Sequence, residues 1–354
     1  MSKYWSKVVR TLEPYVPGEQ PQDKQYIKLN TNENPYPPSP KAMLAMKAAA
    51  GEDLRLYPTP TCDDLRQCIA NYHGLTKEQV FVGNGSDEVL AFCFLAYFNP
   101  GEPILFPDIT YSFYPVYASL FHIDYRTVSL NDDFSIPAEK FLQNNGGIIF
   151  PNPNAPTGRY LELEAVEKII RENSERVVIV DEAYIDFGGE SAVRLINQYA
   201  NLLVVQTFSK SRSLAGLRIG FALGQGALIE ALDRVKNSIN SYTLDRVALA
   251  GARESFQDEA YFQTTRGKIM ATRERVVAVL QSAGFTVVPS AANFIFISHP
   301  EMAAEVIFRQ LRDYGVLVRY FNKPRINNYL RVSIGSDEEM DQFVAVLQKI
   351  VHKS

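Results

Sequence analysis

Short, mostly apolar runs recur along the first two thirds of the chain, and each ends in a cluster of polar or turn-forming residues. The runs are QVFV (79–82), PILF (103–106), GIIF (147–150), VVIV (177–180) and LLVVQ (202–206). Segments with helical spacing, such as residues 87–98 and 161–175, lie between them. Apolar strands that alternate with helices predict a mostly parallel sheet buried on both faces. We therefore expect an α/β fold, with ligands bound at the carboxyl ends of the strands.

The pattern changes from about residue 240. Helical segments are followed by the strand-like runs TVVP, NFIFI, GVLVRYF and YLRVSIG, and a last helical segment begins at residue 337. This order predicts a smaller α+β domain, which the N-terminal arm joins. The proline-rich stretch 31–40 is expected to be a loop that enters the large domain. The expected division is an arm at 1–34, a large domain at 35–240 and a small domain at 241–354.

Composition narrows the classes of function. The chain has 354 residues, of which 46% are apolar and 21% charged, as in ordinary globular proteins. A formal net charge of −4 argues against a nucleic-acid partner, and no apolar run approaches the length of a membrane span. The three cysteines and four histidines lack metal-ligand spacing, so we expect no metal. Unpaired cysteines and the lack of an apolar signal core at the start favour the cytoplasm.

The stretch GNGSDE (83–88) follows the first of these runs. It begins like a dinucleotide-binding fingerprint, but Glu88 stands where the third glycine belongs, which disfavours a nicotinamide dehydrogenase. The amides of Gly85, Ser86 and Asp87 would open a helix and suit a phosphate. The alternative for this stretch is a tight turn with a serine cap.

The stretch TFSKSRSLAGLRIG (207–220) places a lysine and two arginines between two apolar runs. Neighbouring cations favour the neutral amine of Lys210, the form that reacts with an aldehyde. Arg218 and the hydroxyl of Ser209 suit a phosphate. This much positive charge at the end of a buried strand indicates an anionic ligand.

A carboxylate, Asp181, directly follows the run VVIV, and Tyr184 lies three residues later. A carboxylate at the end of a buried strand requires a cationic partner. A phosphate, an aldehyde and a ring nitrogen that pairs with a carboxylate together describe pyridoxal 5′-phosphate.

The motifs SKSRSLAGLR, Asn-Ala-Pro-Thr-Gly, DEAY and LRVSIG occur in the order found in the fold type I pyridoxal-phosphate aminotransferases, which the chain resembles over nearly its full length. LEPYVPGEQP, LNTNENPYPPSP, YPTP and GVLVRYF are similar to those of the histidinol-phosphate aminotransferase family. The resemblance implies a large domain with a mostly parallel seven-stranded sheet, a smaller C-terminal α+β domain, and a homodimer. It also implies amino transfer between L-histidinol phosphate and 2-oxoglutarate in histidine biosynthesis.

The resemblance assigns roles at the cofactor. Lys210 would form the Schiff base and move the substrate proton, while Asp181 would pair with the ring nitrogen. Tyr184 and Asn154 would contact the phenolic oxygen, and Tyr111 would stack on the ring. Many relatives have asparagine immediately before Pro-Thr-Gly, where this chain has alanine, so the preceding asparagine takes this assignment.

The resemblance also assigns residues to the cofactor phosphate and to the substrate. Ser209, Arg218 and the amides of Gly85, Ser86 and Asp87 would hold the cofactor phosphate, which Tyr57 would reach from the neighbouring subunit. The substrate would be bound by Tyr15, Asn32, Arg319 and Arg331. Two arginines in one pocket suit a doubly charged phosphate.

Other readings stay open from the sequence. The same fold and similar motifs occur in threonine-phosphate decarboxylases, and an imidazole pocket that admits phenyl rings would serve an aromatic-amino-acid aminotransferase. A non-catalytic cofactor-binding module of a transcription regulator ranks lower, since the match begins within the first fifteen or so residues.

Overall fold

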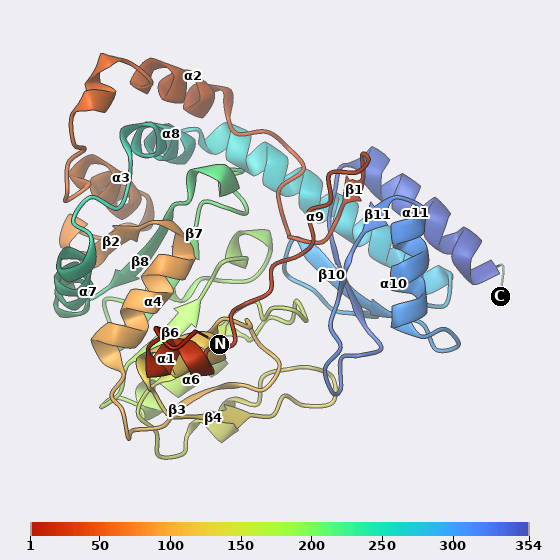
Figure 1. Cartoon of the computed structure of the whole chain (residues 1–354), viewed down its shortest axis with the longest axis horizontal. Helices are drawn as coiled ribbons and strands as arrows, with labels where there is room; N and C mark the ends of the chain where they lie inside the picture. Colours follow the sequence, from red (N-terminus) through yellow and green to blue (C-terminus); the bar gives the residue numbers. More distant parts are fainter. Residues whose placement is uncertain (1, 353–354) are drawn as a thin grey trace.

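The computed structural model describes residues 2–352 of the chain, and a seven-stranded sheet forms its centre (Figure 1). The strand order is β2-β8-β7-β6-β5-β3-β4, and β8 runs in the opposite direction to the other six strands. The strands are β2 (Val80–Gly83), β3 (Ile104–Pro107), β4 (Tyr125–Val128), β5 (Ile148–Pro151), β6 (Val178–Asp181), β7 (Leu202–Thr207) and β8 (Gly220–Gly224). The expected mostly parallel α/β sheet is confirmed.

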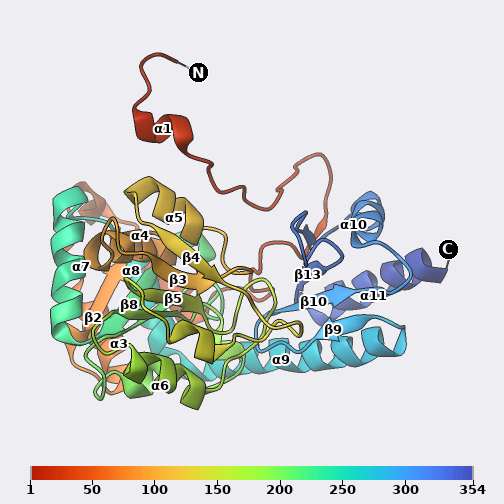
Figure 2. The same cartoon turned by 90° about the horizontal axis from the view of Figure 1, so that it is seen from below.

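Helices cover both faces of this sheet, which explains why every strand except the edge strand β4 is buried along its whole length (Figure 2). In β6, Val178 and Val180 pack into one core cluster, and Ile179 packs into the other. One face carries α4 (Gly85–Tyr97), α5 (Tyr114–Phe121) and α7 (Gly226–Ile239), and the other carries α3 (Asp63–His73), α6 (Leu163–Glu172) and α8 (Arg246–Gln257). The carboxyl ends of the parallel strands therefore lie together at one edge of the sheet, between the two layers of helices.

A second, antiparallel sheet of order β12-β13-β10-β9 has its own apolar core. Its strands are β9 (Thr286–Val288), β10 (Phe294–Ser298), β12 (Arg319–Tyr320) and β13 (Leu330–Ser333), and its helices are α9 (Glu259–Ser282), α10 (Ala304–Asp313) and α11 (Asp337–His352). The run GVLVRYF, expected as one strand, is divided, because β11 (Val316–Leu317) pairs with β1 (Ile27–Lys28) and β12 pairs with β13. The pairing of β1 joins the N-terminal segment to this smaller unit.

The remaining helices lie at the N-terminal end and in short turns. They are α1 (Lys7–Thr11), α2 (Pro40–Ala49) and the 3₁₀ segments Glu52–Arg55, Lys77–Gln79, Ala138–Phe141, Ile185–Phe187, Ala192–Leu195 and Ala215–Leu217. Helix α1 buries none of its residues, and the segment that carries it extends away from the body of the molecule (Figure 2). Within residues 2–352, no helix combines the length and the apolar character that crossing a membrane requires.

The expected boundaries at residues 34 and 240 stay predictions. Side-chain packing favours a later second boundary, because Ala248 and Ala252 of α8 belong to the core on the large sheet. Helix α8 also packs closely against α2 and α3, whereas α9 continues towards the small sheet (Figure 2).

Candidate active site

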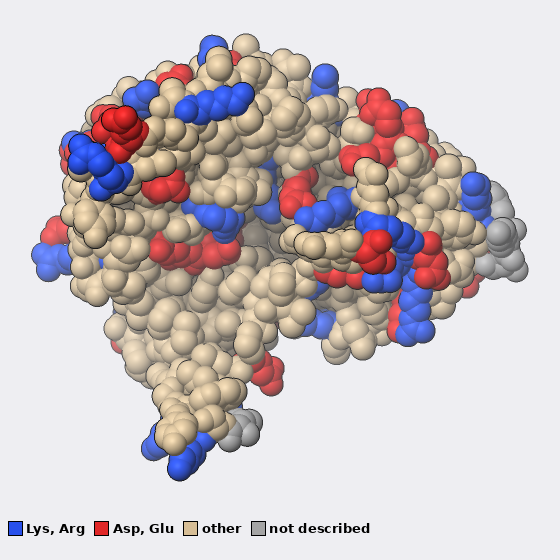
Figure 3. Space-filling model, turned by 45° about the horizontal axis from the view of Figure 1, so that its top comes forward, with Lys and Arg blue, Asp and Glu red and all other residues tan. Residues whose placement is uncertain are grey.

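A cavity lies between the carboxyl ends of the parallel strands and the small sheet, and charged side chains of both signs surround a central hollow in Figure 3. Twelve of the residues expected at the site line it: Tyr15, Asn32, Ser86, Asp87, Tyr111, Asp181, Tyr184, Ser209, Lys210, Arg218, Arg319 and Arg331. They come from the N-terminal segment, from several strand ends of the large sheet, and from two strands of the small sheet. The fold therefore brings together residues that are more than 300 positions apart in the chain, such as Asn30 and Arg331.

Lys210 lies in the turn that follows β7. Its Nζ donates to the backbone oxygen of Thr31 at 3.2 Å and lies 5.8 Å from the centroid of the Tyr184 ring. The side-chain amide of Asn34 donates to the backbone oxygens of Lys210 and Ser211 at 3.0 and 3.2 Å. Hydrogen bonds to the N-terminal segment therefore fix the turn that carries Lys210.

Asp181 ends β6 and is buried. Its carboxylate accepts from the Tyr114 hydroxyl at 2.9 Å and from the backbone amide of Ala183 at 3.3 Å. Burial raises the pKa of Asp181 to about 6, although both hydrogen bonds act in the opposite direction. Such a carboxylate would be stabilised by a cation placed beside it in the cavity.

The first turn of α4 lies so close to Arg218 that a side chain at its first residue would not fit between them. Gly85 has a φ of +80°, and a Cβ there would lie 2.5 Å from Nη2 of Arg218. A Cβ on Gly220 would lie 2.3 Å from the backbone nitrogen of Ser86. Arg218 donates to Ser209 Oγ at 3.4 Å and pairs with Asp87 at 3.1 Å. A helix N-terminus, a hydroxyl and a guanidinium therefore meet at one anion-binding position.

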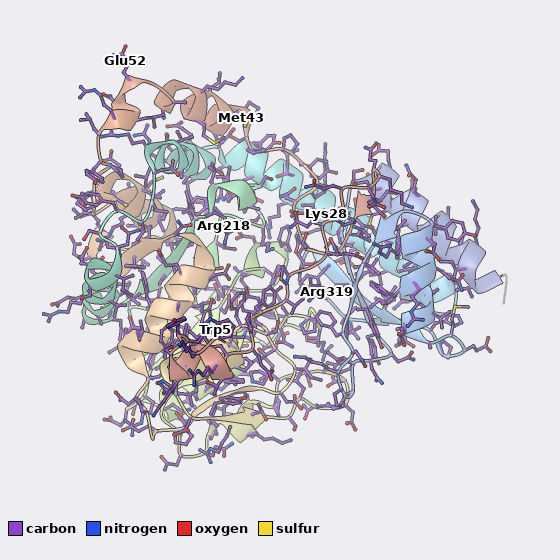
Figure 4. All side chains as sticks on the ribbon, viewed as in Figure 1. Trp5, Lys28, Met43, Glu52, Arg218 and Arg319 are labelled. Atoms are coloured by element: carbon purple, nitrogen blue, oxygen red, sulfur yellow. The ribbon has the colours of Figure 1, made fainter. Side chains whose placement is uncertain are left out.

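Two arginines line the opposite side of the cavity. Arg319 and Arg331 are direct partners on the antiparallel strands β12 and β13, as the sequence predicted if these strands paired. Arg331 donates to Asn30 O at 3.0 Å, and its Nε is buried without a partner among the described residues. Burial lowers the pKa of Arg331, and Arg319 acts in the same direction. Figure 4 shows Arg319 on the side of the small sheet and Arg218 on the side of the large sheet.

Aromatic rings close the cavity from the N-terminal arm. Tyr15 stacks on Phe113, with centroids 4.3 Å apart and an interplanar angle of 24°, and lies 6.4 Å from the Tyr111 ring. The Tyr111 hydroxyl donates to Asp87 at 2.7 Å. Tyr15 thus lines the cavity from the N-terminal arm, and its contact with a substrate stays a prediction.

Three expected residues do not line the cavity, and the first is Gly85, which has no side chain and lies beside Arg218. Asn154 is 0% exposed, and its amide donates to Ile109 O and to Thr157 Oγ1, both at 3.0 Å, while Ala155 faces the cavity instead. Tyr57 is 78% exposed and stacks on Tyr242, with centroids 4.6 Å apart. Their assignments stay predictions.

Sequence reasoning missed several groups of the site. The Tyr114 hydroxyl bonds Asp181, and the backbone oxygens of Asn30 and Thr31 accept from Arg331 and Lys210. Tyr114 begins α5 three residues after Tyr111, but nothing in the sequence indicates that its hydroxyl will meet Asp181, or which backbone oxygen will meet a distant side chain.

The comparisons with known proteins agree with this geometry. The family model described as aminotransferase class I and II matches residues 24–347. A histidinol-phosphate aminotransferase of Clostridium botulinum (strain Langeland) is 60% identical over 353 residues, which cover 100% of both chains. That of Clostridium acetobutylicum is 58% identical over 351 residues, which cover 99% of this chain and 100% of the relative. The crystal structure of the Sinorhizobium meliloti histidinol-phosphate aminotransferase in complex with pyridoxal-5'-phosphate has a TM-score of 0.91 at 26% identity, covering 100% of this chain and 99% of that chain.

Asp181→Asn tests the buried charge in the protein without ligand. Because the folded-state pKa of about 6 exceeds the ordinary 3.8, the contribution of Asp181 to stability is present below about pH 4 and lost as the pH rises through 6. The shift corresponds to about 3 kcal/mol. The free energy of unfolding of the wild type, relative to that of the variant, should fall by that amount between about pH 4 and pH 7 in urea titrations. An equal difference at both pH values would mean that solvent reaches this carboxyl.

Proposed function

Because this chain belongs to the aminotransferase class I and II family, we propose that it transfers the amino group of L-histidinol phosphate to 2-oxoglutarate, with pyridoxal 5′-phosphate as cofactor. The products are imidazole acetol phosphate and L-glutamate, and the reaction belongs to histidine biosynthesis. The observation that carries the proposal is one cavity containing a lysine amine, an anion-binding helix start, a buried carboxylate and two arginines. The unpaired cysteines favour the cytoplasm as its compartment.

The residues of the cavity fit this cofactor. The amides that open α4, the hydroxyl of Ser209 and Arg218 would hold its phosphate, where glycine at position 85 leaves the necessary space. Asp181 would pair with its ring nitrogen, because the carboxylate has only neutral donors of its own. When bound, the cofactor supplies an aldehyde that condenses with amines and a ring that withdraws electrons from the substrate carbon.

Lys210, Asp181 and Tyr184 would each have a different role at the bound cofactor. The Nζ of Lys210, which donates to Thr31 O in the structure, would bind the cofactor aldehyde and, when free, would take and return the proton at the substrate Cα. Asp181 would keep a proton on the ring nitrogen. The hydroxyl of Tyr184 would donate to the phenolic oxygen.

The arginine pair would bind the other end of the substrate. Two guanidinium groups suit the doubly charged phosphate of L-histidinol phosphate, and in the second half-reaction the carboxylates of 2-oxoglutarate. Arg331 has an unpartnered buried Nε on this side, so it retains a donor for an anion. Tyr15 would cover the bound substrate from the arm.

The absorbance of the purified protein tests this function. We expect a visible cofactor band that L-histidinol phosphate removes in the absence of an acceptor and that 2-oxoglutarate restores. Lys210→Ala should fold and show no turnover, whereas Lys168→Ala, which changes an exposed lysine paired with Glu139, should turn over normally. A band that responds only to threonine phosphate or to aromatic amino acids would reassign the substrate. Normal turnover by Lys210→Ala would refute the role of Lys210.

Arg331→Ala tests the shared anion site. The loss of charge-assisted hydrogen bonds should raise the KM for both L-histidinol phosphate and L-glutamate by about 10- to 100-fold. Arg309→Ala, on the exposed face of α10 and paired with Glu305, is the matched control and should leave both values unchanged. If only one of the two KM values rises, the two molecules do not share Arg331.

We propose further that the protein is a homodimer in which Tyr57 completes the cavity of the partner. Exposed apolar side chains gather around Tyr57 on α2 and the segments that follow α2 and α7, and Figure 4 labels Met43 and Glu52 along this edge. The exposed residues are Met43, Leu44, Leu54, Leu56, Ile239 and Tyr242. Arg246 donates to the backbone oxygen of Tyr57 at 2.8 Å, which fixes the segment that presents this side chain.

Hybrid dimers test the exchange of Tyr57. Tyr57→Ala and Lys210→Ala should each be inactive or nearly so as the pure variant. After the two are mixed and refolded together, hybrid dimers should regain activity, because one of their two cavities has both native residues. The two unmixed variants, refolded separately, are the control. No regain in a mixture that contains hybrid dimers would show that Tyr57 acts within its own subunit or outside the site.

A further inference from the structure

Residues 30–34 run along the cavity and contact three of its functional side chains. Arg331 donates to Asn30 O at 3.0 Å, Lys210 donates to Thr31 O at 3.2 Å, and Asn32 donates to the Tyr184 hydroxyl at 3.0 Å. The contacts of Asn30 and Thr31 use backbone oxygens, which any residue would supply. The contact of Asn32 uses its side chain, so the identity of residue 32 matters.

Asn32 is held in one conformation. It is 1% exposed, and its φ of 55° lies in the left-handed region, which asparagine tolerates better than most residues that have a Cβ. Its backbone oxygen accepts from the side chain of Asn293 at 3.0 Å. The backbone and the side chain are therefore both fixed by contacts on every side.

Ser333 determines which way the Asn32 amide points. The backbone amide of Asn32 donates to Ser333 Oγ at 2.8 Å, so this hydroxyl is an acceptor for that bond. Its own proton is then free to donate to Asn32 Oδ1, 3.0 Å away. With Oδ1 engaged by Ser333, the Nδ2 of Asn32 faces Tyr184 as a donor.

This contact controls the proton of the Tyr184 hydroxyl. A hydroxyl has one proton to donate. Because Asn32 Nδ2 donates to a lone pair of the Tyr184 oxygen, this bond does not use the hydroxyl proton. Within residues 2–352, the Tyr184 hydroxyl donates no hydrogen bond, and the residue lines the cavity. The proton is thus available to a ligand in the cavity.

The neighbouring side chains cannot supply this donor instead. Ala155 presents a methyl group to the cavity, and both amide hydrogens of Asn154 are used by Ile109 O and Thr157 Oγ1. A ligand oxygen at this position would therefore depend on the Tyr184 hydroxyl alone of these three side chains for a hydrogen bond.

We propose that Asn32 is a positioning residue that, oriented by Ser333, directs the Tyr184 hydroxyl proton into the cofactor cavity. The proposal rests on the proposed function, since the acceptor of that proton is the phenolic oxygen of the bound cofactor. It assigns to Asn32 a role that acts through Tyr184 rather than through the substrate. Asn32 therefore sets the protonation of the cofactor and leaves substrate recognition to the arginines.

The test is the pH titration of the absorbance of the bound cofactor. Asn32→Gly removes the amide and relieves the left-handed backbone. Without a directed proton on the phenolic oxygen, the midpoint of the titration should rise by about one pH unit, and cofactor affinity should fall by about 10-fold. Lys210, Arg331 and Asp181 line the same cavity and are unchanged in these variants, so their charges are constant across the comparison.

A double-mutant cycle separates action through Tyr184 from direct action. Tyr184→Phe should raise the midpoint at least as much as Asn32→Gly, and the double variant should show no further rise. Additive shifts would overturn the proposal, because they would mean that Asn32 contacts the cofactor independently. An Asn32→Gly midpoint equal to that of the wild type would also overturn it.

Two further variants serve as a negative control and as a substitute for Asn32→Gly. Asn145→Ala removes a buried asparagine side chain that does not line this cavity, one that donates to Gln143 O, and should leave the midpoint unchanged. If Asn32→Gly does not fold, Ser333→Ala must raise the midpoint in its place, and an unchanged value refutes the proposal. A wild-type protein without any cofactor band would refute the proposed function itself, and this proposal with it.

Discussion

A buried carboxylate without a cationic partner is the constraint around which the site is organised. Asp181 lies at the end of a central strand, where a tyrosine hydroxyl and one backbone amide are its hydrogen-bond donors among residues 2–352, and burial raises its pKa. The nearest strand turn along the sheet carries Lys210, yet this amine bonds Thr31 and not the carboxylate. Opposite charges are thus held in one cavity without cancelling each other, which leaves both available to a ligand with a cationic and an electrophilic end.

The second constraint is the pairing of two like charges. Arg319 and Arg331 are opposite each other on adjacent strands, an arrangement that is destabilising without compensation. Compensation comes from the N-terminal segment, since Arg319 donates to Val16 O and Pro17 O, and Arg331 to Asn30 O. Neutral oxygens lower the repulsion but leave the net positive charge in place, so the pair retains its attraction for an anion. The arm is therefore part of the anion-binding site rather than an appendage.

The sequence predicted the features that depend on local pattern. Buried strands, their alternation with helices, and the turns after Asp181 and before Lys210 all follow from short stretches of residues. It could not predict contacts between Thr31 and Lys210, which are 179 positions apart, because no local pattern specifies which backbone oxygen faces which side chain. Asn154 illustrates the same limit: one residue of register decides whether it or Ala155 faces the cavity. The place of α8 shows the same limit, because its apolar spacing indicates a buried face but does not say which sheet that face will meet.

The small sheet and the cofactor side of the cavity are joined through a short chain of hydrogen bonds. Arg331 and Ser333 are two residues apart on β13 and therefore face the same side of its sheet. Ser333 bonds Asn32, and Asn32 bonds Tyr184, which follows β6 of the large sheet. One strand of the small sheet thus carries both the arginine proposed to bind the substrate and the serine that orients Asn32 towards Tyr184. The proposed substrate end and the proposed cofactor end of the cavity therefore depend on the placement of the same strand.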